Sequence, residues 1–292
     1  MGMQSLKNNQ TKFKNHKMNF KNIKIALASI LFLATISFTA QETVTVPLSN
    51  PTKPGLLKMG IINGSIKIIG TSGKEVVIKG TKRKESESRY KQHRKSKSNT
   101  DGLKRISNNS LEFSAEEYDN TVRVRGSVHG TTDFEIQVPK NFSLKISTIN
   151  RGEIYVENVN GTMDVSNTNG KITLKDISGS VSADALNRNI VVNFIKVTPN
   201  VAMAFSSLNG DIDITFPKNL KADIKVKSDR GEIFTDFDLK TKPSSAKITK
   251  GDNRKGNAYN VKVEKWITGS INGGGPEILF KNFNGDVIIR AK

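Results

Sequence analysis

Residues 157–180 read ENVNGTMDVSNTNGKITLKDISGS, in which one phrase recurs as VNGTMDV, TNGKITL and, running on to Ala183, ISGSVSA. If Gly152 marks the start of the unit, the same position returns every nine residues at Gly161, Gly170, Gly179 and Arg188. The residues two and four positions later are apolar or small in each copy: Ile154 and Val156, Met163 and Val165, Ile172 and Leu174, Val181 and Ala183, Ile190 and Val192. This period of two between turn residues predicts short β-strands.

The residue two positions before each unit decides between two all-β architectures. Asn-Gly pairs between alternating runs are a hairpin signal, so an antiparallel meander or sandwich is one alternative. Val159, Thr168 and Ile177, however, have the opposite parity to the inward positions of the preceding unit. A straight strand would point them outward, whereas the corner of a coil would turn them back into the core. We therefore predict a parallel β-solenoid with two units in a coil of about 18 residues.

Longer spacings support the same architecture. The intervals from Arg188 to Gly210 and from Gly210 to Gly231 predict whole coils of 22 and 21 residues. Pro139-Lys140-Asn141 and Pro217-Lys218-Asn219 lie 78 residues apart, and both should end a strand because proline cannot donate to a β-ladder. At the Asn-Gly corners we expect glycine to supply positive φ and asparagine side chains to hydrogen-bond from coil to coil.

At about residues 43–292 the chain resembles the bacterial family of exported β-strand-repeat proteins named adhesins, a family without established activity. The resemblance rests on Gly64-Ser65-Ile66-Lys67-Ile68, a charged connecting segment, the strand Phe134-Glu135-Ile136-Gln137-Val138-Pro139 and the ladder that follows. It implies a right-handed, β-helix-like fold, and it transfers no binding residues. The chain departs from the family pattern at Arg188, where the glycine is missing.

The first 40 residues have the pattern of a signal peptide. Lys17, Lys21 and Lys24 precede the uncharged run IALASILFLATISFTA at 25–40, and Met18 could be the true start. The expected mature domain is 41–292, which contains no second run long enough to cross a membrane. The chain has no cysteine, which excludes disulfides and an N-terminal lipoprotein anchor. We expect an exported protein that is periplasmic, associated with the cell surface, or secreted.

The chain is strongly basic. Its net charge is +19, and removing the six lysines of residues 1–40 leaves 19 − 6 = +13. Residues 79–105 hold 11 Lys plus Arg and three acidic residues. This segment predicts a solvated loop or helix, or an electrostatic patch for anionic glycan, lipopolysaccharide or another envelope component. The candidate binding residues of this basic patch are Lys82, Arg83, Lys84, Arg89, Arg94, Lys95 and Lys97.

No catalytic or metal-binding constellation stands out. His93 and His129 lack metal-ligand spacing, and GGGP at 273–276 lacks the residues of a P-loop or a calcium repeat. Asp211 and Asp213 share one strand face, and Asp164 and Asp176 could fall on neighbouring coils. Carboxylates so placed would serve a glycoside-cleaving enzyme only in a cleft. We therefore assign no catalytic residue, metal or cofactor.

Three functional hypotheses remain. The first is a non-enzymatic exported adhesin that presents a basic surface to anionic glycan or lipid. The second is a β-helix enzyme acting on polysaccharides, and the third is a periplasmic scaffold or sensor for a protein partner. Dedicated nucleic-acid binding is disfavoured, because Tyr90 is the aromatic residue within the basic segment and the chain carries an export signal.

Overall fold

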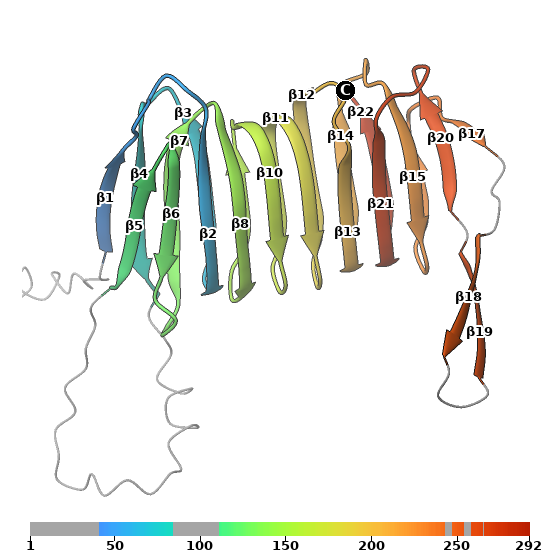
Figure 1. The fold of residues 1–292 in the computed structure, drawn as a ribbon, viewed down its shortest axis with the longest axis horizontal. Coiled ribbons are helices and arrows are strands. Elements are labelled where there is room, and N and C mark those ends of the chain that lie inside the picture. Colours follow the sequence, from blue (N-terminus) through green and yellow to red (C-terminus); the bar gives the residue numbers. More distant parts are fainter. Residues whose placement is uncertain (1–40, 84–110, 243–246, 254–257, 265) are drawn as a thin grey trace, which may run out of the picture. The chain divides into compact units, whose positions relative to one another are not determined.

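The computed structural model describes residues 41–83, 111–242, 247–253, 258–264 and 266–292, with side chains outside 242–265. These residues belong to one compact unit, Thr39–Lys292, and they form strands and turns without a helix. Figure 1 shows the strands standing side by side. The expected signal peptide and most of the basic segment at 79–105 lie outside the described residues.

Two parallel ladders make up the body of the unit. The first ladder runs in the order β6 (Thr121–Gly126), β2 (Gly55–Asn63), β8 (Phe142–Asn150), β10 (Asn160–Asn167), the second half of β11 (Ile172–Ala185), β13 (Met203–Asn209), β21 (Glu277–Asn284) and β15 (Ala222–Ser228). The second ladder runs in the order β7 (Thr132–Pro139), β3 (Ile66–Thr71), β9 (Ile154–Glu157), the first half of β11, β12 (Ile190–Val197), β14 (Ile212–Phe216), β22 (Val287–Ala291) and β16 (Ile233–Thr235).

Antiparallel strands cover the ends of the ladders. At one end β4 (Glu75–Lys82) pairs with β7, β1 (Gln41–Pro47) pairs with β4, and β5 (Phe113–Tyr118) pairs with β6. At the other end β20 (Ile267–Ile271) pairs with β15, and β17 (Lys240–Lys242) pairs with β20. Strands β18 (Lys247–Asn253) and β19 (Ala258–Glu264) form a separate hairpin. Covered ends leave fewer strand edges open for pairing with other chains.

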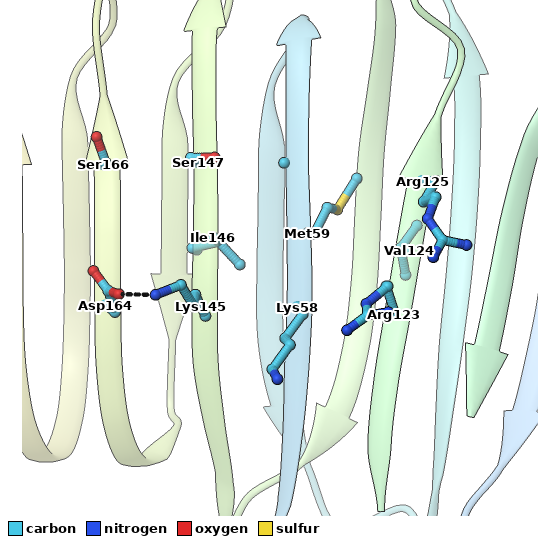
Figure 2. A pocket seen from close by; sticks show the side chains of 11 residues that line it. Lys58, Met59, Arg123, Val124, Arg125, Lys145, Ile146, Ser147, Asp164 and Ser166 are labelled. Carbon is cyan, nitrogen blue, oxygen red and sulfur yellow. Dashed lines mark hydrogen bonds and ion pairs between the residues drawn. The ribbon is translucent and has the colours of Figure 1, made fainter. Parts of the chain in front are cut away.

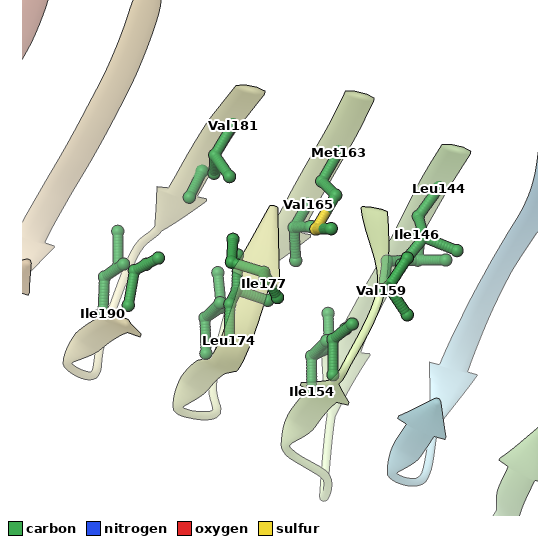
Figure 3. Close-up of a cluster of buried hydrophobic side chains, with 14 of the residues drawn as sticks. Leu144, Ile146, Ile154, Val159, Met163, Val165, Leu174, Ile177, Val181 and Ile190 are labelled. Carbon is green, nitrogen blue, oxygen red and sulfur yellow. The ribbon is translucent and has the colours of Figure 1, made fainter. Parts of the chain in front are cut away.

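Each coil contributes one strand to each ladder, and equivalent residues stack. Ile172, for example, lies between Ile154 of β9 and Ile190 of β12, and Met163 lies between Leu144 of β8 and Val181 of β11. All of these side chains are buried (Figure 3). The predicted parallel β-solenoid is confirmed, and the antiparallel meander is excluded. The two Pro-Lys-Asn turns both follow a strand of the second ladder, as predicted from the 78-residue repeat.

The parity argument holds at every second corner. Val159 and Ile177 turn into the core and are fully buried, as predicted (Figure 3). Thr168 is only half-buried, and Leu186 is 41% exposed. The nine-residue unit therefore makes two kinds of corner in alternation, because each coil needs one turn from the first ladder to the second and one turn back. Only the turn back folds its leading residue inward.

The glycine corners depend on close contact between coils more than on backbone conformation. Gly64 and Gly179 have positive φ, but Gly152 and Gly170 do not. A Cβ on Gly170 would lie 1.8 Å from the carbonyl oxygen of Gly152, the corner of the preceding coil. Among the Asn-Gly corners, Gly64 and Gly285 have positive φ, but Gly161, Gly170 and Gly210 do not, so our expectation of positive φ is wrong at three of these five corners. Arg188 also has no positive φ.

The terminal coils are inserted within the stack. The pair β2 and β3 lies between the later coils β6/β7 and β8/β9, and the last pair, β21 and β22, lies between β13/β14 and β15/β16. Gly231 consequently packs on Gly285, not on Gly210 as the 21-residue spacing suggested. The 21 residues from Gly210 to Gly231 do make one coil, but the coil of β21 and β22 lies between these two glycines in the stack.

Candidate anion-binding surface

A row of cations crosses the outward face of the first ladder near one end. Lys58 of β2 is paired in register with Arg123 of β6 on one side and with Lys145 of β8 on the other. All three point outward because their neighbours Leu57, Val124 and Ile146 are buried. Adjacent strands are about 4.8 Å apart, so three positive groups leave the sheet within about 10 Å.

Small residues form the next outward row and leave space beside the cations. In this row Gly60 lies between Arg125 and Ser147, and Ser147 is followed by Ser166. Because Gly60 has no side chain, the surface is hollowed there, with a volume of about 510 Å³. We call this site the anion hollow and define it by Lys58, Arg123, Arg125 and Lys145 around Gly60, Ser147 and Ser166 (Figure 2).

Two of the four cations of the hollow have ion-pair partners. Lys145 Nζ lies 2.9 Å from Asp164 Oδ2, and Arg125 is paired with Glu116. The hydrogen bond and charge of Asp164 raise the pKa of Lys145 above its usual value, so this lysine stays protonated. In the part of the chain that the structure describes, Lys58 and Arg123 have no ion pair. These two residues are therefore the cations of the hollow that no direct ion pair in the described residues engages.

The hollow can bind an anionic group with both charge and hydrogen bonds. Arg123 offers a planar fork of donors, Lys58 offers an ammonium, and the hydroxyl groups of Ser147 and Ser166 can donate or accept. Carboxylate, sulfate and phosphate groups fit such a set of donors. The site is open and shallow, so a ligand would lie on the sheet with one side in water.

The basic patch predicted from sequence is only partly described. Arg83 donates from Nε to Asp133 Oδ2 at 2.9 Å and from Nη1 to the Arg151 carbonyl at 2.6 Å, so it fastens β4 to the neighbouring corners. Lys82 also has a contact. Lys84, Arg89, Arg94, Lys95 and Lys97 lie outside the described residues, and their role as a patch stays a prediction.

Sequence reasoning missed the anion hollow because its residues are far apart in the chain. Lys58, Arg123 and Lys145 belong to strands that become neighbours only because the coil of β2 and β3 is inserted in the stack. The sequence does contain a signal, because each strand carries a cation followed two residues later by another outward residue. These phrases are Lys58-x-Gly60, Arg123-x-Arg125 and Lys145-x-Ser147. Aligning these phrases by register would have placed them together.

The paired carboxylates hold the fold together. Asp213 accepts two hydrogen bonds from the guanidinium of Arg290, at 2.8 and 3.1 Å. Asp211 accepts from the Asp286 backbone N–H at 3.0 Å and from Asn189 at 3.2 Å. Asp164 and Asp176 lie on one coil, not on neighbouring coils as we expected, because β10 and the first half of β11 belong to the same turn.

No group of three or more His, Cys, Asp or Glu side chains among the described residues could hold a metal ion. Over the same residues, no helix has the length and hydrophobicity needed to cross a membrane. The Gly273–Gly275 stretch forms a loop between β20 and β21, with positive φ at Gly273 and Gly274.

Comparison with solved structures finds proteins of distant sequence. The crystal structure of a "putative cell adhesion protein" from Clostridium sporogenes is 13% identical, with 87% of this chain and 100% of that chain covered and a TM-score of 0.42. A "putative adhesin" from Bacteroides fragilis is also 13% identical, with 86% and 97% covered and a TM-score of 0.32. No curated protein matches the sequence.

Comparison with protein families gives a match that begins within the first ladder of the solenoid. Residues 143–265, from the start of β8 to the end of the separate hairpin, match the family described as Toastrack DUF4097. This segment contains the repeated NG-x-I-x-V phrases, one of the features on which the resemblance to a β-strand-repeat family was based. The resemblance is confirmed over residues 143–265, the segment of the chain that is similar to this family.

Proposed function

We propose that the protein is exported and acts as a non-enzymatic adhesin of the cell envelope that binds acidic glycan on the outward face of its first ladder. The observation that carries the proposal is the pair of unpaired cations, Lys58 and Arg123, within the anion hollow. The charge of +13 expected for the mature chain supports it, since a basic surface attracts anionic polymers and speeds their association.

The open geometry of the hollow favours a polymer over a small metabolite. Sites for small ligands are usually concave and bury most of the ligand surface. The anion hollow lies on a flat sheet face, and its cations come from three strands of the first ladder. A chain with repeated charges can gain by contacting several such groups at once, which compensates for weak binding at each one.

Reversing the two unpaired charges tests the proposal. Lys58→Glu combined with Arg123→Glu should weaken binding of the full chain to heparin, used here as an acidic polysaccharide probe, by at least about tenfold at low salt, because two attractive contacts become repulsive. Binding should be measured by isothermal titration calorimetry at two ionic strengths. The wild-type affinity should fall as salt rises, and the salt dependence should be smaller in the variant.

The control has the same change in net charge elsewhere. Lys74→Glu with Lys196→Glu reverses two exposed lysines that lie outside the hollow, in the β3–β4 turn and on β12. This variant should bind heparin within about twofold of wild type. Equal losses in both variants would show that net charge, not the hollow, governs binding. Unchanged binding in both would overturn the proposal, as would binding that is confined to anionic lipid vesicles.

A further inference from the structure

A second outward row borders the anion hollow, and it is apolar. It consists of the residues that immediately precede the asparagine corners: Ile62, Ile149, Leu186, Leu208 and Phe283, with Thr168 between the second and third. Their exposed fractions run from 37% at Phe283 to 44% at Ile149. Four of them lie on β2, β8, β13 and β21, and Thr168 and Leu186 directly follow the ends of β10 and β11, so the register of the first ladder places the six residues side by side. We call this row the apolar strip.

A row of amides runs along the outer margin of the strip. Asn169 donates to Asn150 at 2.7 Å, Asn187 to Asn169 at 2.7 Å, Asn209 to Asn187 at 2.9 Å and Asn284 to Asn209 at 2.7 Å. Each bond takes one N–H from one amide and one lone pair from the next. An amide has two N–H donors and an oxygen with two lone pairs, so each inner asparagine keeps one donor and one lone pair for another partner.

The strip is continuous with the anion hollow on the same face. Two residues along each strand, Gly60 leads to Ile62, Ser147 to Ile149 and Ser166 to Thr168. Side chains two apart in a strand point to the same side. At the far end, the guanidinium of Arg230 lies 5.1 Å from the centre of the Phe283 ring. A ligand bound in the hollow therefore has the apolar strip and the amide row beside it. If the ligand follows the strip to its β21 end, it reaches the guanidinium of Arg230.

The chemistry of the two rows selects the kind of ligand. A hydrocarbon chain over the strip would cover amide groups without offering them a hydrogen bond, which is unfavourable. A sugar chain presents C–H faces to the apolar side chains and hydroxyl groups to the amides. Neighbouring strands repeat both groups about every 4.8 Å, over about 24 Å from β2 to β21. A linear polymer can follow this direction, across the strands and along the stack.

We propose that the apolar strip extends the anion hollow into a binding surface for a linear acidic polysaccharide, which lies across the strands with an acidic group in the hollow. This inference rests on the proposed function. It adds the direction of the chain and the part of each sugar that is recognised. It also predicts that affinity rises with the length of the saccharide until the ligand spans the strip from β2 to β21.

The test uses heparin oligosaccharides of increasing length with the full chain. Leu186→Ser combined with Leu208→Ser should leave binding of the shortest oligosaccharides unchanged and weaken binding of the longest ones about fivefold, because only long chains reach β11 and β13. Lys58→Glu with Arg123→Glu should weaken binding at every length. The control, Ile195→Ser with Val201→Ser, changes two other exposed apolar residues and should bind as wild type does.

The oligosaccharide series distinguishes failure of the strip proposal from failure of the proposed function. If the Leu186 and Leu208 variant binds long oligosaccharides as tightly as wild type, the strip proposal is wrong and the anion hollow stands. If no oligosaccharide binds any form of the protein, both proposals are wrong. Binding of fatty-acid micelles that depends on Leu186 and Leu208, without binding of saccharide, would identify the strip as a lipid contact and would also overturn the inference.

Discussion

Gly170 shows why the sequence repeats glycine at the corners of the coil. Its Cα faces the backbone of Gly152 in the preceding coil, and an added Cβ would lie 1.8 Å from that carbonyl oxygen. The obstacle is backbone held by strands on both sides, so it cannot move aside as a side chain would. Glycine here is required by the distance between coils, and a non-glycine residue would force two corners apart.

Replacing Gly170 with alanine should therefore destabilise the protein by about 3 kcal/mol, the upper end of the usual cost of overpacking. Chemical denaturation followed by circular dichroism would measure the change in the free energy of unfolding. Gly73→Ala is the matched control, because a Cβ there meets only the hydroxyl of Thr71, at 3.2 Å in an exposed turn. Similar losses in the two variants would show that contact between corners does not explain the glycine repeat.

Among the secondary-structure elements, the antiparallel strands β1, β4 and β5 form a cap over one end of the stack, and Glu117 holds two parts of this cap together. Its carboxylate accepts from the Ser49 backbone N–H at 3.0 Å, from the Ser49 hydroxyl at 2.9 Å and from the Asn120 backbone N–H at 2.8 Å. It thereby joins the segment after β1 to the turn between β5 and β6. The hydrogen bonds from Ser49, the largest cause, lower the pKa of Glu117 below the usual 4.5.

The lowered pKa gives the cap a dependence on pH. A carboxylate whose pKa is lower in the folded state stabilises that state above its unfolded pKa, and this contribution is lost as the pH falls through the folded pKa. Glu117→Gln should thus lower the melting temperature at neutral pH, and the difference from wild type should shrink in acid below pH 4.5. Thermal melts across this range would check the prediction, and a gap independent of pH would contradict it.

The elements that could be predicted from sequence are those that repeat at a fixed local spacing. Ile154 stacks on Ile172 in one ladder and Met163 on Val181 in the other, as expected, because a period of two fixes the face of a strand. Thr168 was predicted to point into the core and is only half-buried, because successive nine-residue units form two different turns in alternation. The anion hollow could not be predicted, because Lys58 and Arg123 meet through pairing between strands far apart in sequence.

At the scale of the whole molecule, the order of coils in space differs from their order in the chain at both ends. The last coil, β21 and β22, has a strand neighbour on both sides in each ladder. Phe280 stacks on Phe205 of β13, with ring centres 5.3 Å apart. The chain can complete the stack only after its final residues have been made, because β15 and β16 have no parallel neighbour until β21 and β22 lie beside them.

Ending the chain at Asn272 should therefore abolish folding, although only the C-terminal coil is removed. Ile278, Phe280, Val287 and Ile289 are buried, and burial of each is worth about 1.5–3 kcal/mol, so the sum of about 6–12 kcal/mol approaches the whole stability of a typical domain. Replacing residues 247–264 with Asn-Gly is the matched control, since it removes β18 and β19, which pair only with each other. Circular dichroism and size-exclusion chromatography should show a folded protein with the oligomeric state of wild type for the control, and loss of structure or aggregation for the truncation. A truncated chain that melts cooperatively near the wild-type temperature would mean that β13 and β15 can close the stack without the inserted coil.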